Sequence, residues 1–504
     1  MKCISGQMRS TFLLLSTILL QVIGVALSQG GFVEENGEQN GQPSAICNNV
    51  SQSLLEEIRR YKPLVDQIGQ IIINGTFKGI AYRNLSEFVD NYGARLTGSE
   101  SLEKSIDHVL ETMKFIGLDD AHCEDVTAPK WVRGHESLTM TIPYKKNIQV
   151  LGLLPTVQTP EEGITSEIVV VENYKDLQEN KNDLLSRVKG RILVFNHPFD
   201  DAVNAVTYRH RSAIEGAKVG AIATIVRSYT TFSLGTPHTG EMHYEDDIPP
   251  IPSAEITVED AELLGRLYNK GQKIVLNLIL RNQRVGNITT RNTIGDLKGS
   301  NIPDEYVLVS GHADSWDVGQ GALDDGYGVI LSLLVPNVLK TMNLIPKRTV
   351  RSIVWTAEEI SKVPLGAQQY LEKHEEELRN KYSFFLEADS GIFNARGLIL
   401  NGTVEAQCIV SEILKLMEPR IIAKTRIVTP FPDLKTDIVP LMRATGVAGA
   451  LLDTDGEKYF WYHHSNADTV TALNPDDLDV CLALMTSLSY VLADMSVLLP
   501  RMQV

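Results

Sequence analysis

Apolar positions in the C-terminal part of the chain form short continuous runs, and helix-sized segments separate these runs. Three runs are typical of strands that are buried on both faces: residues 306–310, 349–355 and 383–386. Between them, residues 326–339 and 364–377 show helical spacing, although Pro336 is expected to kink or end the first helix. Because parallel strands need such crossovers, the pattern predicts an α/β fold. We expect a mixed, mostly parallel sheet with helices on both faces.

The middle of the chain has a different pattern. Four short apolar runs predict strands at residues 168–171, 191–195, 221–226 and 274–280, and helical spacing predicts helices at 212–219 and 258–269. We therefore expect an inserted, β-rich module over residues 155–291. Residues 51–154 and 292–504 then form the first and second parts of one larger domain, and an apolar helix over 476–498 ends it.

The N-terminus has the pattern of a secretory signal peptide. Lys2 and Arg9 give a positive start, residues 12–27 are mostly apolar, and small residues stand at the end of this run. The alternative is a membrane anchor, but the run is short for a span and Gln21 interrupts it. We expect cleavage of residues 1–28 and passage through the secretory pathway. No later stretch is expected to be long and apolar enough to cross a bilayer.

Sequons and cysteines agree with a secreted glycoprotein. Five Asn-x-Ser/Thr sequons are present: Asn49, Asn74, Asn84, Asn287 and Asn401. Four cysteines follow the expected cleavage site: Cys47, Cys123, Cys408 and Cys481. They permit one or two disulfides, and three pairings stay open. Residues 29–50 are rich in Gly, Gln, Glu and Asn, and are expected to be disordered or to form a pro-segment.

Length and charge narrow the class of partner. At 504 residues the chain is too long for one ordinary domain. Its formal net charge of −16 argues against nucleic acid, because phosphate binding requires clustered Lys and Arg. A soluble, self-repelling surface is the plainer interpretation of this charge.

Acidic and imidazole side chains stand just after the expected strands or in a loop late in the chain. Five of them are candidate metal ligands: His312, Asp324, Glu359, Asp389 and His464. Two divalent metals held close together need one shared carboxylate and further ligands on each side. We predict that Asp324, in a glycine-rich turn, bridges the two metals. His312 and Asp389 then complete one coordination sphere. Glu359 and His464 complete the other.

Two further acidic residues have predicted roles beside the metals. Glu358 directly precedes a ligand and is expected to act as general base on a water, then to protonate the leaving amine. Asp314 stands two residues after His312 and is expected to hydrogen-bond its far ring nitrogen and fix its tautomer. Tyr462 is a candidate donor to the oxyanion, with packing in its loop as the alternative.

Other catalytic signatures are absent from the sequence. The segment 374–378 begins like the His-Glu-x-x-His zinc motif but lacks the second histidine, and no Gly-x-Ser-x-Gly elbow is present. The histidines of the inserted module are scattered along it, and we predict no metal cluster there: His197, His210, His238 and His243.

Together these stretches resemble the co-catalytic zinc exopeptidases, a family that includes secreted aminopeptidases and glutamate carboxypeptidases. The resemblance rests on residues 310–317, 319–326, 355–359, 387–391 and 459–465, with 468–469. It implies two Zn²⁺ ions per chain, hydrolysis of dipeptides or short peptides with a free amino end beside the metals, and a secreted or lysosomal homodimer. It also implies that residues 155–291 are a protease-associated domain. Of the paired histidines, it implies His464 as the ligand, with His463 as the alternative.

The chain departs from the family pattern next to the paired glutamates. The family usually has glycine soon after them, whereas residues 360–365 read Ile-Ser-Lys-Val-Pro-Leu. This loop borders the expected base, so substrate fit or rate is expected to be affected there. All five ligands and Glu358 are present, which favours an active enzyme over a silent binding protein on the same scaffold. An aminopeptidase with broader substrates is the alternative enzyme.

Overall fold

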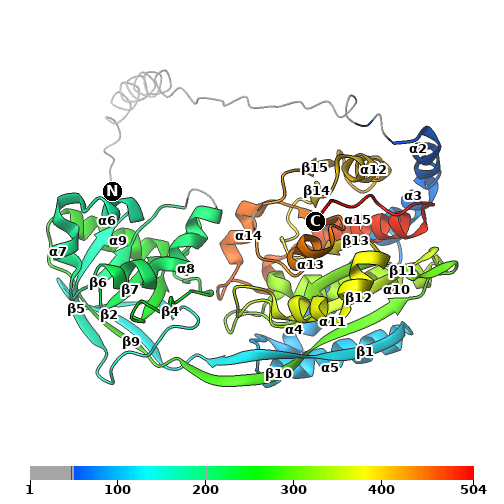
Figure 1. The fold of residues 1–504 in the computed structure, drawn as a ribbon. Helices are drawn as coiled ribbons and strands as arrows, with labels where there is room; N and C mark the ends of the chain where they lie inside the picture. The colour runs from blue at the N-terminus through cyan, green and yellow to red at the C-terminus, as the bar shows by residue number, and fades with distance from the viewer. Residues whose placement is uncertain (1–46, 48–49, 200–201, 433) are drawn as a thin grey trace, which may run out of the picture. The chain divides into compact units, whose positions relative to one another are not determined.

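A computed structural model describes Cys47, Val50 and residues 51–199, 202–432 and 434–504, apart from the side chains of 202–205. The expected signal peptide, most of the segment 29–50 and Asn49 lie outside these residues. The described chain forms two eight-stranded sheets, each with helices packed against it (Figure 1).

The first sheet is mixed and has a parallel centre. Its strand order is β1 (Asp119–Val132), β10 (Gln283–Leu297), β12 (Arg348–Trp355), β11 (Ile302–His312), β13 (Tyr382–Glu387), β16 (Gly449–Asp453), β14 (Gly397–Asn401) and β15 (Arg426–Val428). The strands β12, β11, β13 and β16 run parallel, whereas β10 and β14 pair antiparallel with β12 and β16. The predicted α/β class, the three predicted strands and their parallel crossovers are confirmed.

Helices cover both faces of this sheet because its central strands are apolar on both faces. In β11, Val307 and Val309 belong to one core cluster and Leu308 to another, as the two-residue repeat of a strand requires. Helices α10 (Tyr327–Thr341) and α15 (Pro475–Asp494) pack on the first face, and α11 (Leu365–Lys381) and α13 (Ile438–Thr445) on the second. The helical N-terminal segment adds to the first core: α2 (Gln52–Arg59), α3 (Lys62–Ile73), α4 (Ile80–Tyr92) and α5 (Glu100–Ile116).

We predicted that α10 would kink or end at Pro336. The helix does not end there, because it continues to Thr341. Proline has no N–H, so it leaves the carbonyl one turn earlier without its helical partner. That carbonyl belongs to Ser332, and it accepts a hydrogen bond from Oγ of Ser352 at 2.8 Å. A neighbouring strand therefore supplies the missing donor.

The second sheet has the order β3 (Lys146–Ile148), β2 (Glu136–Ile142), β9 (Val275–Leu280), β5 (Ile164–Val171), β6 (Ile192–Phe195), β7 (Ala223–Arg227), β8 (Ser253–Ile256) and β4 (Val150–Gly152). Its helices are α6 (Tyr174–Gln178), α7 (Leu184–Val188), α8 (Ala202–Lys218) and α9 (Val258–Asn269). The predicted strands and helices of this region are present. The sheet also takes in β2, β3 and β4, which precede the expected boundary at residue 155, and α8 begins earlier than predicted.

Apart from η3 (Lys181–Asp183), the remaining elements lie in the C-terminal half. They are α12 (Val404–Lys415), α14 (Gly456–Tyr462) and the short turns η4 (Ala322–Gly326) and η5 (Val470–Ala472). The segment Ala322–Thr341 is long and apolar enough to cross a membrane, which corrects the expectation that no such stretch follows the signal peptide. It is 94% buried inside the protein, as the core helix of a sheet would be.

One disulfide joins Cys47 to Cys408 on α12. Cys123 and Cys481 are free thiols. Of the one or two disulfides that the sequence permits, the described residues therefore form one. The bond connects the start of the described chain to a helix far along the sequence, with a separation of 361 residues.

Candidate active site

The predicted site residues meet at the carboxyl edge of the parallel strands. His312 is the last residue of β11, Glu358 and Glu359 follow β12, and Asp389 follows β13. Because parallel strands end at the same edge of a sheet, residues that follow them in the sequence lie close together in space. The fifth predicted ligand, His464, lies just after α14.

Asp324 lies in the short turn η4, and its backbone angles there are not helical. Asp468 holds this turn: its carboxylate accepts hydrogen bonds from the backbone N–H groups of Ala322, Leu323 and Asp324, at 2.6–3.1 Å. A side chain at Gly328 would put its Cβ 2.1 Å from Oδ2 of Asp325, so a glycine is required here. Buried carboxylates thus fix the turn from both sides.

The first group of predicted ligands centres on His312. Its Nε2 atom lies 3.5 Å from Oδ1 of Asp324 and 3.9 Å from Oδ1 of Asp389. All three side chains are buried or nearly so. Burial lowers the pKa of His312, but the surrounding carboxylates outweigh it and raise the pKa well above its usual value. This negative environment is one that also favours a divalent cation.

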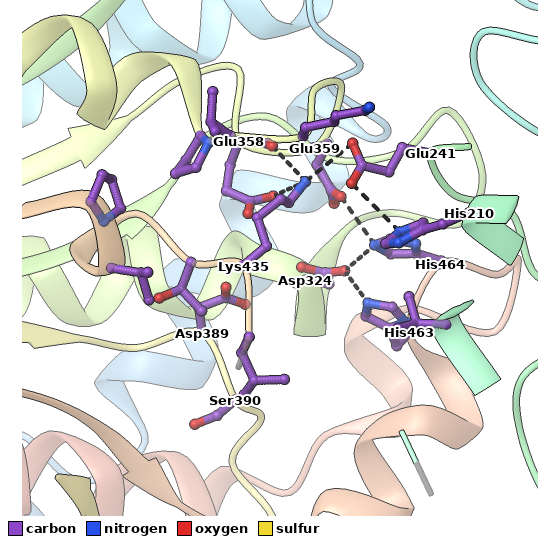
Figure 2. A pocket seen from close by; sticks show the side chains of 18 of the residues that line it. His210, Glu241, Asp324, Glu358, Glu359, Asp389, Ser390, Lys435, His463 and His464 are labelled. Carbon is purple, nitrogen blue, oxygen red and sulfur yellow. Dashed lines mark hydrogen bonds and ion pairs between the residues drawn. The ribbon is translucent and has the colours of Figure 1, made fainter. Parts of the chain in front are cut away.

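The second group centres on His464 (Figure 2). Its Nε2 atom lies 3.1 Å from Oδ2 of Asp324 and 3.0 Å from Oε2 of Glu359. The indole N–H of Trp316 donates to Oε2 of Glu359 at 2.7 Å. Burial lowers the pKa of His464, yet Glu359 and Asp324 raise it overall to about 9. Asp324 therefore faces both groups, as a bridging carboxylate must.

The spacing of these donors fits metal ions. With bonds of about 2.0–2.2 Å to nitrogen and oxygen, two ligands of a tetrahedral zinc ion lie roughly 3.3–3.6 Å apart. Two triads at this site each bring three ligand atoms within 4.8 Å of one another: His312, Asp324 and Glu359 in one, and Asp324, His463 and His464 in the other. Asp324 belongs to both, and Glu359, predicted for the second set, also lies beside the first. Among the described residues, the buried Oε1 atom of Glu359 has no hydrogen-bond partner. A buried carboxylate oxygen without a partner lowers the stability of the folded state, and a cation bound at this point would supply the missing partner.

His463 also reaches the bridging carboxylate. Its ring stacks on that of His464 with centroids 3.5 Å apart, and its Nε2 atom lies 3.5 Å from Oδ2 of Asp324. It is farther from this oxygen than His464, whose Nε2 atom also lies 3.0 Å from Oε2 of Glu359. The geometry therefore favours His464 as the ligand in that position.

Glu358 lies beside the metal ligands and is almost completely buried. Burial raises the pKa of its carboxyl to about 8, although the ammonium group of Lys435 lowers it, with Nζ 3.4 Å from Oε2. The same Nζ donates to the backbone carbonyls of Glu358 and Ser361 at 2.8 and 3.2 Å. Lys435 thus fixes the turn that carries the expected base, and sequence reasoning did not identify it.

The predicted bond from the Asp314 carboxylate to His312 is corrected. Nδ1 of His312 lies 2.9 Å from the backbone carbonyl of Asp314 and 3.8 Å from its carboxylate. The carboxylate instead accepts the backbone N–H groups of Glu358 and Glu359, both at 3.2 Å, and the hydroxyl of Thr97 at 2.9 Å. Asp314 therefore sets the ring orientation through its main chain and the paired glutamates through its side chain.

Residues of the second-sheet region, which runs from β2 to β9 (residues 136–280), complete the surroundings of His464. The backbone carbonyl of Thr239 lies 3.1 Å from Nδ1 of His464, and Nη1 of Arg209 lies 3.4 Å from the same atom. Arg209 also donates to the Thr239 carbonyl at 3.1 Å. No sequence motif links these residues to His464, because they are distant along the chain and belong to the other sheet region.

A cavity of about 920 Å³ opens onto the site. Asp324, Glu358 and Glu359 line it together with residues of the second-sheet region such as Arg209 and Glu241. Tyr462, the considered oxyanion donor, is not among the residues that line it, and its ring packs against Phe393 with centroids 5.8 Å apart. The packing interpretation therefore holds for Tyr462.

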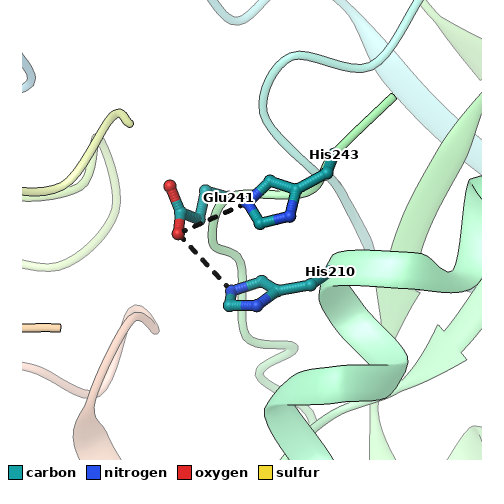
Figure 3. A group of neighbouring side chains, drawn as sticks. All are labelled: His210, Glu241 and His243. Atoms are coloured by element: carbon teal, nitrogen blue, oxygen red, sulfur yellow. Dashed lines mark ion pairs between the residues drawn. The ribbon is translucent and has the colours of Figure 1, made fainter. Parts of the chain in front are cut away.

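The histidines of the inserted region, where we predicted no metal cluster, are not all scattered in space, because one group there could hold a metal ion. His210, Glu241 and His243 bring three ligand atoms within 4.8 Å of one another (Figure 3). Their positions along the sequence hid this, because His210 lies on α8 and the other two residues lie in the loop between β7 and β8.

Comparison with known proteins agrees with this geometry. The model of peptidase family M28 matches residues 292–489. Carboxypeptidase Q of Rattus norvegicus is 41% identical over 91% of this chain and 94% of the rat protein. The solved structure of an M28 peptidase precursor from Shewanella amazonensis covers 88% of this chain and 99% of its own, with 28% identity and a TM-score of 0.82. A zinc aminopeptidase from Bacillus subtilis, at 22% identity and a TM-score of 0.61, covers 84% of this chain and 97% of its own, and shares the fold.

The chain belongs to peptidase family M28. Its similarity to the rat protein runs through both sheet regions, since it spans nearly the whole length of each chain. The chain is accordingly a zinc metallo-exopeptidase.

Proposed function

We propose that this M28 exopeptidase binds two Zn²⁺ ions and hydrolyses dipeptides or short peptides, with Glu358 as general base. The observation that carries the proposal is the position of Asp324, whose two carboxylate oxygens face His312 on one side and His464 on the other. One carboxylate between two sets of nitrogen and oxygen donors is the arrangement that a two-metal site needs.

The proposed ligands fall into two sets that share Asp324. His312 and Asp389 would hold one ion, and Glu359 and His464 would hold the other. When bound, the ions supply Lewis acidity to a water molecule and to the scissile carbonyl group. Imidazole and carboxylate donors also accept manganese or cobalt, so the choice of zinc rests on the family.

The chain's own groups would move the proton. Glu358 takes a proton from the attacking water and delivers it to the leaving amine. Burial raises the pKa of this carboxyl and the ammonium group of Lys435 lowers it, and a base whose pKa lies near the working pH can both take and return a proton. Asp314 and Lys435 position this residue, because they hold its backbone N–H and its backbone carbonyl respectively.

We infer the substrate class from the cavity and from the relatives. The proposed metal ligands are buried or nearly so, and residues of both sheet regions line the cavity beside them, which favours a peptide end over an internal bond. Relatives named carboxypeptidase Q favour release of a C-terminal residue from a short peptide. A broader aminopeptidase of the same fold is the second candidate.

We extend the proposal to the protein's setting. A signal peptide over residues 1–28, the Cys47–Cys408 disulfide and the sequons favour the secretory route to a secreted or lysosomal location. Family resemblance favours a homodimer and assigns residues 155–291 to a protease-associated domain. Neither membrane nor nucleic acid enters the proposed reaction, whose partner is a peptide.

Assays of the full secreted chain would test this function. Free dipeptides, N-blocked dipeptides and longer peptides are compared, before and after removal of metal with a chelator. We expect rapid cleavage of free dipeptides, little cleavage of blocked ones, and recovery of the lost activity on addition of Zn²⁺. Faster cleavage of long peptides from the amino end would favour the aminopeptidase. Full activity after complete removal of metal would overturn the proposal.

A further inference from the structure

A second set of metal-ligating side chains lies in the wall of the same cavity. Nε2 of His210 is 3.5 Å from Oε1 of Glu241, and Nε2 of His243 is 3.7 Å from the same oxygen. Both distances are too long for hydrogen bonds. They are close to the separation of roughly 3.3–3.6 Å expected for two ligands of one tetrahedral zinc ion.

The backbone brings these three residues together. Met242, between Glu241 and His243, packs into the core of the second-sheet region, whereas the side chains of Glu241 and His243 lie beside His210 of α8 (Figure 3). The backbone N–H of His243 donates to the carbonyl of His210 at 2.9 Å and fixes the loop against the helix.

The donor chemistry suits a divalent cation. The rings of His210 and His243 stack with centroids 4.7 Å apart, so both Nε2 atoms lie beside the same oxygen of Glu241. Nε2 of His243 is buried and makes no hydrogen bond among the described residues. The side chains of His210, Glu241 and His243 are 25%, 8% and 20% exposed, which leaves a route for an ion to enter.

The surrounding charges do not forbid a cation. The ammonium group of Lys435 lies close by, with Nζ 3.9 Å from the other oxygen of Glu241, Oε2. That oxygen faces the cavity, whereas Oε1 faces the two imidazoles (Figures 2 and 3). Glu241 can therefore contact Lys435 and a cation through different oxygen atoms.

We propose that His210, Glu241 and His243 form a further divalent-cation site, separate from the pair of ions at Asp324. Two histidines and one glutamate bind zinc in proteins and leave a coordination position open. The ion would join α8 to the loop that carries Glu241 and so fasten one wall of the substrate cavity. The proposal is independent of the two-zinc function, because it shares no ligand with that site.

Metal counting on the full chain tests the proposal. Wild-type protein and the double variant His210→Gln/His243→Gln are stripped of metal, equilibrated with buffered Zn²⁺, and analysed for zinc per chain by mass spectrometry. We expect the double variant to bind one zinc ion fewer than wild type. His135→Gln, at an exposed histidine, serves as the matched control and should keep the wild-type count.

Two further measurements separate the possible results. Asp324→Asn should lose zinc from the proposed pair and keep the ion at His243, so a failure of the two-zinc function is seen independently. In zinc-soaked crystals of wild-type protein, an anomalous peak should lie about 2.0–2.2 Å from Glu241 and both imidazoles. An unchanged zinc count in the folded double variant, or no peak in saturated crystals, would overturn the further site.

Discussion

The imidazole of His464 and the backbone carbonyl of Thr239 lie 3.1 Å apart, at Nδ1 and O respectively. A carbonyl oxygen can only accept, so this contact requires the proton of the neutral ring to be on Nδ1 and leaves Nε2 with the lone pair. Nε2 is the atom that faces Asp324 and Glu359. A residue of the second-sheet region thus sets the tautomer of a proposed metal ligand.

Replacement of Arg209 should weaken this arrangement. Its Nη1 atom donates to the Thr239 carbonyl at 3.1 Å, and its charge lies beside His464. We expect Arg209→Met to lower zinc affinity or kcat/KM about 10–100-fold, the usual effect of removing a group that orients a ligand. Arg211→Met, on the same helix, is the control and should retain affinity. Equal zinc affinity and activity in Arg209→Met would exclude the positioning role.

Asp314→Asn should misplace the paired glutamates. The Asp314 carboxylate accepts bonds at both oxygens, and an asparagine offers an N–H₂ group at one of these positions. We predict a loss of about 1–3 kcal/mol in the free energy of unfolding, the cost of an unsatisfied buried group. Turnover should fall as much as about 100-fold, because a shift of about 1 Å in Glu358 suffices. Denaturant unfolding and kcat measurements check this, with exposed Asp304→Asn as the control.

Glu358→Gln should separate proton transfer from metal binding. The amide cannot accept the proton of water, so turnover should decrease by about 10²–10⁴-fold. None of the proposed ligands is altered, so zinc per chain should equal that of wild type. Parallel measurement of kcat and metal content decides the point: wild-type turnover would remove Glu358 from its role, whereas loss of zinc would make it a ligand.

The disulfide should contribute to stability and not to catalysis. It closes a long loop between Cys47 and Cys408, and such bonds typically stabilise a protein by about 2–4 kcal/mol. The double variant Cys47→Ser/Cys408→Ser should lose stability of this order in denaturant unfolding and keep wild-type kcat/KM. Cys123→Ser, which alters a free thiol, is the control. Unchanged stability of the double variant would contradict this expectation.

Much of the fold could be predicted because the central strands are apolar on both faces and have helices between them. The candidate ligands follow the same strands, so the order of the sequence carried information about their position. The roles of Thr239, Arg209 and Lys435 could not be predicted, since they arise from contacts between distant segments. The cluster at His210 was missed for the same reason. The partner of the Asp314 side chain was also missed, because the main chain of Asp314 contacts His312 while its carboxylate contacts the paired glutamates.

The central claim is that Asp324 joins two zinc ions. X-ray data from crystals of the zinc-loaded full chain, collected on both sides of the zinc absorption edge, test it most directly. We predict two anomalous peaks about 3.5–4 Å apart, each about 2.0–2.2 Å from a carboxylate oxygen of Asp324. A single peak between His312 and His464, or two peaks that do not share Asp324, would contradict it.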